Sequence, residues 1–96
     1  MSGMDWEKDP ELRALRREFV QSFAERARAL RAAGPDVRKI ELIVHKLAGA
    51  ARSYGFEDIG NLAERAEDLA AAGGGVELSS LVSRLCVLLE TPPAGF

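Results

Sequence analysis

Residues 44–56 read VHKLAGAARSYGF and contain His45, the single histidine of the chain. Gly49 follows His45 by four residues, so in a helix the two lie on one face, about a turn apart. Glycine inside a helix costs roughly 1 kcal/mol relative to alanine, and its presence here needs a reason. Because Gly49 has no side chain, it leaves space beside the imidazole. We interpret this space as room for a bulky partner to approach the ring.

The segment around His45 has the apolar periodicity of an amphipathic helix. Its apolar residues recur at spacings of three and four and form one stripe, made of Val37, Ile40, Val44, Leu47, Ala51 and Tyr54. At about 100° per residue, His45 falls well away from the centre of this stripe. The histidine shares its face with Arg38, Glu41, Ala48, Gly49 and Arg52. We therefore expect the imidazole to be exposed on a shallow patch with a cation at each end.

The same residues carry a family resemblance. The run His45-Lys46-Leu47-Ala48-Gly49-Ala50-Ala51, followed by Gly55, resembles the signature of histidine-containing phosphotransfer (HPt) domains. That signature is histidine, any residue, an aliphatic residue, often lysine, then glycine and small residues, with a second glycine ten positions after the histidine. Residues 56–67 also resemble the next helix of the family. The family's frequent lysine is Ala48 here, which leaves open how the phosphoryl charge is neutralised.

Length and composition limit the classes of protein that remain. The 96 residues are enough for one domain with a modest core, and 47% hydrophobic with 29% charged residues is ordinary for a globular protein. A net charge of −2 gives no basic surplus for nucleic acid. No apolar run approaches the ~20 residues of a membrane span, and no secretion signal is evident. The single cysteine excludes an internal disulfide and suits the cytoplasm.

Four helices are expected along the chain. Asp9 and Pro10 are typical of a helix start. The apolar residues after them recur at helical spacing and predict one continuous helix that ends at Gly34. This apolar stripe consists of Leu12, Leu15, Phe19, Phe23, Ala27 and Leu30. A second helix is predicted from Pro35 to Gly55, a third near 57–72 and a fourth near 77–90. Short connections make neighbouring helices antiparallel. We predict an all-α, single-domain, antiparallel four-helix bundle with up-down-up-down topology over residues 9–91, between an N-terminal extension (1–8) and a tail (92–96).

Most other chemistries find no support in the sequence. One histidine and one cysteine do not supply the three or four ligands of a metal site, so no metal is expected. No second histidine is available for nucleophilic hydrolysis. Cys86, between Leu85 and Val87, is expected to be a buried, inert thiol. The chain has no nucleotide-binding loop, so we expect a phosphoryl carrier that is not itself an enzyme and needs no cofactor.

The resemblance to HPt domains implies that a receiver domain supplies the aspartyl phosphate and the Mg²⁺. His45 then accepts the phosphoryl group and passes it to another receiver in a phosphorelay. Arg52 and Lys46 are candidates to neutralise the phosphoryl charge, and Ala48 and Gly49 are expected to give access to the ring. Arg38, Glu41 and Leu42 are candidate docking residues. We expect a monomer whose partners are receiver domains of response regulators or hybrid histidine kinases, with neither nucleic acid nor a membrane as partner.

Several alternatives remain open at this point. Leu42 could be a docking contact, but single exposed leucines are common on protein surfaces, and the sequence favours neither interpretation. The chain could be a helical interaction module that binds a receiver or kinase without carrying phosphate, although such a module has no use for Gly49 beside His45. The phosphoacceptor bundle of a histidine kinase would need an ATP-binding domain that this sequence lacks. The sequence leaves open which imidazole nitrogen reacts.

Overall fold

The computed structural model describes residues 8–91, all of whose regular structure is helical. The helices are α1 (Pro10–Gln21), α2 (Phe23–Ala33), α3 (Val37–Ser53), α4 (Glu57–Ala71) and α5 (Val76–Glu90). The expected tail at residues 92–96, and all but the last residue of the expected extension at 1–8, lie outside the described residues.

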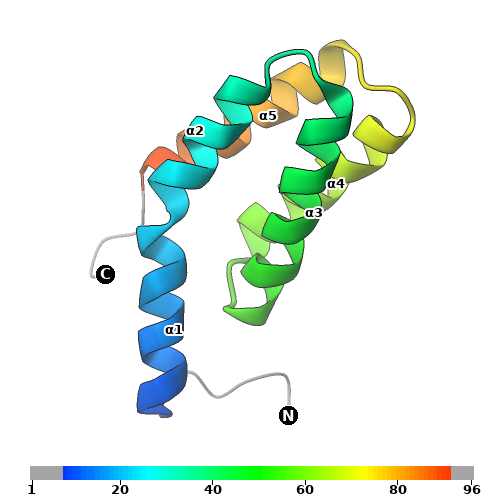
Figure 1. Cartoon of the computed structure of the whole chain (residues 1–96). Coiled ribbons are helices and arrows are strands. Elements are labelled where there is room, and N and C mark those ends of the chain that lie inside the picture. The colour runs from blue at the N-terminus through cyan, green and yellow to red at the C-terminus, as the bar shows by residue number, and fades with distance from the viewer. Residues whose placement is uncertain (1–7, 92–96) are drawn as a thin grey trace.

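Helices α2 to α5 form the bundle. Within it α2 packs on α3, α3 on α4 and α4 on α5, and α5 closes the arrangement by packing against α2. Figure 1 shows α3 and α4 side by side, with α5 passing behind α2. The predicted all-α four-helix bundle is confirmed.

The predicted first helix is wrong in one respect, because the structure divides it at Ser22 into α1 and α2. The Ser22 hydroxyl donates to the backbone oxygen of Phe19 at 2.6 Å and accepts from Arg26 Nε at 2.9 Å. A serine hydroxyl that bonds back to the preceding turn competes with the helical backbone pattern and bends the helix. As a result α1 turns away from the direction of α2, as Figure 1 shows.

The C-terminal end of α1 packs against the turn between α3 and α4. The Phe19 ring lies 5.4 Å from that of Tyr54 and 5.8 Å from that of Phe56, measured between centroids. Arg16 Nε also donates to the backbone oxygen of Tyr54 at 2.8 Å. These contacts stabilise the turn between α4 and α3, the helix that carries His45.

The helix boundaries follow local capping chemistry. Asp9 caps α1 by accepting from the Glu11 amide at 2.9 Å, with Pro10 as the first helical residue, as predicted. The second predicted helix begins two residues later than expected, because Asp36 provides the cap and Pro35 lies in the turn. Gly55 ends α3 with φ of 81°, a conformation that favours glycine.

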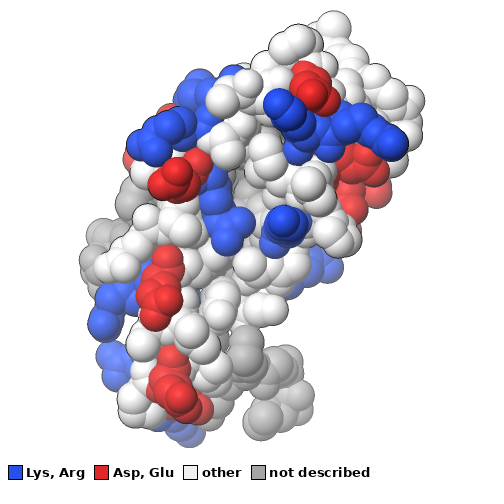
Figure 2. Space-filling model, viewed as in Figure 1, with Lys and Arg blue, Asp and Glu red and all other residues white. Residues whose placement is uncertain are grey.

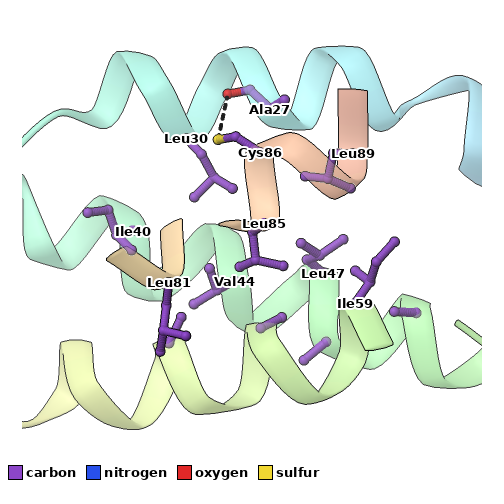
Figure 3. Close-up of a cluster of buried hydrophobic side chains, with 14 of the residues drawn as sticks. Ala27, Leu30, Ile40, Val44, Leu47, Ile59, Leu81, Leu85, Cys86 and Leu89 are labelled. Atoms are coloured by element: carbon purple, nitrogen blue, oxygen red, sulfur yellow. Dashed lines mark hydrogen bonds between the residues drawn. The ribbon is translucent and has the colours of Figure 1, made fainter. Parts of the chain in front are cut away.

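The core lies between α2, α3, α4 and α5, as Figure 3 shows. Its fully buried side chains include Phe23, Leu30, Val44, Leu47, Leu85, Cys86 and Leu89. Cys86 is only 1% exposed, and burial raises the pKa of its thiol, which therefore stays protonated at neutral pH. This is the buried thiol that the sequence predicted.

Candidate functional site

His45 lies in the middle of α3 and points away from the core. Its side chain is 67% exposed, whereas its neighbours Val44 and Leu47 are fully buried. This difference follows from the angular positions of the three residues around the helix, because His45 falls outside the apolar stripe. The predicted exposure of the imidazole is confirmed.

Among residues 8–91, the imidazole has one hydrogen-bonding partner, Glu67 of α4. His45 Nδ1 lies 2.6 Å from Glu67 Oε2, and the Glu67 side chain is 29% exposed. An ionised carboxylate can only accept, so Nδ1 must carry the proton in this contact. In a neutral ring the lone pair is then on Nε2, for which no described residue supplies a hydrogen bond.

Glu67 was not among the residues predicted from the sequence, although the sequence holds a signal for it. Helices α3 and α4 are joined at a turn that ends at Phe56, and His45 and Glu67 are each eleven residues from Phe56. In two antiparallel helices of equal rise, residues at equal distances from the turn lie at the same level. An acidic residue at this position was therefore a candidate partner for the histidine.

The three predicted docking residues lie together beside His45. Arg38, Glu41 and Leu42 line a shallow hollow in the surface with His45 and Glu67. Leu42 is 58% exposed, which is unusual among the large apolar side chains of the described chain. The hollow thus combines an accessible imidazole with one apolar and two charged side chains.

The two predicted access residues differ in the structure. A Cβ added at Gly49 would meet no atom within 4 Å beyond its own helix and chain neighbours, so this position is open. Ala48 is only 7% exposed and belongs to the core. Its placement on the open histidine face was wrong, because Ala48 is turned farther toward the packed side of α3. Of these two residues, Gly49 alone leaves open space on the exposed face of α3.

The family comparison agrees with this geometry. The family model of the Hpt domain matches residues 12–91, which is most of the chain. The chain belongs to the HPt family. No curated protein and no solved structure matched the chain in the other two comparisons. Membership makes this chain a phosphotransfer module of phosphorelay signalling, and such modules interact with receiver domains.

The two candidate cations of this HPt domain occupy different surroundings. Lys46 is exposed and forms no ion pair with any described residue. Arg52 reaches across to α4, where its Nη2 lies 2.9 Å from Glu64 Oε1. Of the cations expected at the two ends of the patch, Arg38 borders the hollow and Arg52 is paired with Glu64.

Among residues 8–91, no three histidine, cysteine, aspartate or glutamate side chains come together as metal ligands would. Within the same range, every helix is too short or too polar to cross a membrane.

Proposed function

We propose that this HPt domain accepts a phosphoryl group on Nε2 of His45 from a receiver-domain aspartyl phosphate and passes it to a second receiver. The observation that carries the proposal is the His45–Glu67 contact. It engages Nδ1 at 2.6 Å and leaves Nε2 as the exposed nucleophile of a ring that is 67% accessible. The open position at Gly49 adds room for the partner that brings the phosphoryl group.

The chemistry needs little from this chain beyond positioning. The Nε2 lone pair forms the N–P bond as the bond between phosphorus and the aspartyl oxygen breaks, and the aspartate leaves as a carboxylate. Positive charge develops on the imidazole during this step. The Glu67 carboxylate is hydrogen-bonded to Nδ1, the other ring nitrogen. There it stabilises the positive charge and fixes the orientation of the ring. The partner brings the acyl phosphate and the metal ion that activates it.

The surface around His45 suits a partner with both apolar and acidic groups. Leu42 supplies an exposed apolar contact, and α3 also presents the exposed cations Arg38, Lys39 and Lys46. In the view of Figure 2, basic side chains predominate over α2 and α3, whereas α1 carries both signs of charge. A receiver whose phosphorylated aspartate is surrounded by further acids would meet complementary charge on this face.

The direct test is incubation of the full chain with a phosphorylated receiver, followed by mass spectrometry at alkaline pH. We expect a single phosphoramidate on His45, stable in alkali and labile in acid. Two-dimensional ¹H–¹⁵N NMR of the ring should place the phosphorus on Nε2. Label on Nδ1, or on another residue, would contradict the proposal. Binding of the receiver without any label would instead identify an interaction module.

A substitution of Glu67 tests the role of the ring contact. Glu67→Ala should lower the transfer rate roughly tenfold, because a hydrogen bond to a charged group is worth about 1.5–3 kcal/mol and part of it is replaced by water. Glu67→Gln should lose less, since its amide oxygen can still accept from Nδ1. Asp68→Ala, an exposed neighbour on α4, is the matched control. A wild-type rate in Glu67→Ala would show that the partner alone orients the ring.

A further inference from the structure

Helices α3 and α4 place Arg52 at the level of a buried glycine. Arg52 comes four residues before the end of the connecting turn at Phe56, and Gly60 comes four residues after it. His45 and Glu67 form the corresponding pair farther from the turn. Both pairs keep the same register, and seven residues of helix, or about 10.5 Å, separate the two levels.

Gly60 is buried inside α4, where glycine is unfavourable for the helix. The structure shows which atoms would be affected by a side chain at this position. An added Cβ would lie 3.2 Å from Arg52 Cγ, 3.7 Å from Arg52 Nε and 3.8 Å from Ala51 Cβ. Only the first of these distances is tight. The missing side chain at Gly60 therefore makes room for the aliphatic part of Arg52.

The guanidinium of Arg52 contacts α4 at a residue that lies between the levels of Gly60 and Glu67. Its Nη2 contacts Glu64, which is four residues beyond Gly60 and three residues before Glu67. The backbone positions of Glu64 and Glu67 are three residues, or about 4.5 Å, apart along the helix axis. On α3, the residue at the level of Glu64 is Ala48, whose small side chain puts no bulk in the way.

We propose that Gly60 is a positioning residue, which allows Arg52 to lie along α4 so that its guanidinium is held near His45 as the counter-charge of the phosphoryl group. This inference rests on the proposed function. The Arg52–Glu64 contact uses one of five N–H donors, and both side chains are about half exposed. The remaining N–H donors can bond phosphoryl oxygens. An arginine side chain that is already ordered along α4 loses less conformational entropy on binding these oxygens than a freely moving one.

The test compares Gly60→Ala, Arg52→Ala and the double variant. The measured quantity is the equilibrium constant for phosphoryl exchange between the full chain and a receiver, which reports the stability of the phosphorylated chain relative to the unphosphorylated chain and is independent of the transfer rate. Arg52→Ala should lower this constant about fivefold and Gly60→Ala about threefold, as expected for an exposed ionic contact. The double variant should equal Arg52→Ala. Asn61→Ala, an exposed substitution on α4, should leave the constant unchanged.

A spectroscopic measurement separates positioning from fold stability. The ¹⁵Nε resonance of Arg52 should shift on phosphorylation in the wild type and in Asn61→Ala, and shift less in Gly60→Ala. The melting temperature of Gly60→Ala should match or exceed that of the wild type, because alanine favours the helix and the exposed arginine can move.

The outcomes that overturn this inference differ from those that overturn the proposed function. If His45 is phosphorylated but Gly60→Ala exchanges like the wild type, Gly60 has no positioning role and the proposed function stands. If Gly60→Ala keeps its full effect in the Arg52→Ala background, Gly60 acts through helix packing and the inference is wrong. The inference is also wrong if Lys46→Ala lowers the constant and Arg52→Ala does not. A wild-type chain that takes no phosphoryl group overturns the proposed function itself.

Discussion

His45→Gln should accept no phosphoryl group, so that label from a phosphorylated receiver falls to background. Glutamine is polar and of similar length, but its amide nitrogen has no lone pair available for attack on phosphorus. The fold should be unaffected, because the His45 side chain is 67% exposed and, among the described residues, contacts the carboxylate of Glu67. We expect a change of at most about 1 kcal/mol in the free energy of unfolding, the usual scale for an exposed contact.

The measurement is phosphorylation at alkaline pH with denaturation monitored in parallel by circular dichroism. Asn61→Ala is the matched control, since it changes an exposed polar side chain of α4 and keeps the imidazole. If His45→Gln were labelled to the wild-type level, His45 would not be the phosphoacceptor.

Gly49→Gln should block phosphotransfer while the bundle remains folded. The added side chain would lie beside the imidazole on the open face of α3, in the space that a docking partner needs. Misplacement of a reacting group by about 1 Å can cost roughly 100-fold in rate, and we expect a loss of that order. The free energy of unfolding should rise by up to ~1 kcal/mol, because a Cβ at position 49 meets no neighbouring helix and glutamine favours the helix.

Gly49→Ala provides the graded control for this experiment. It gives a similar gain in helix propensity but adds only a methyl group, so its transfer rate should stay close to that of the wild type. Transfer in Gly49→Gln should be measured with saturating and with limiting receiver, to distinguish weaker docking from slower chemistry. Equal rates in all three proteins would mean that the partner approaches His45 from another side.

The sequence by itself determined which segments of the chain are helical and that the histidine is exposed. Both depend on periodicity within one helix, since residues such as Val44 and Leu47 fall on the apolar stripe and His45 does not. Short connections at Gly34 and Gly55 also determined that consecutive helices are antiparallel. The break at Ser22 was not predicted, because the apolar stripe continues through it. Apolar periodicity carries no information about the hydrogen bonds of the Ser22 hydroxyl with Phe19 and Arg26.

Only the tertiary structure decided which side chains of α3 meet those of α4. Ala48 is buried, His45 contacts Glu67 and Arg52 contacts Glu64, and none of these facts follows from the pattern of α3 alone. Such contacts depend on the register between two helices and on the room between them, which at Gly60 is taken by the Arg52 side chain. The sequence therefore pointed to His45 as the proposed phosphoacceptor, while helix packing determined which ring nitrogen contacts Glu67 and which α4 side chains lie near it.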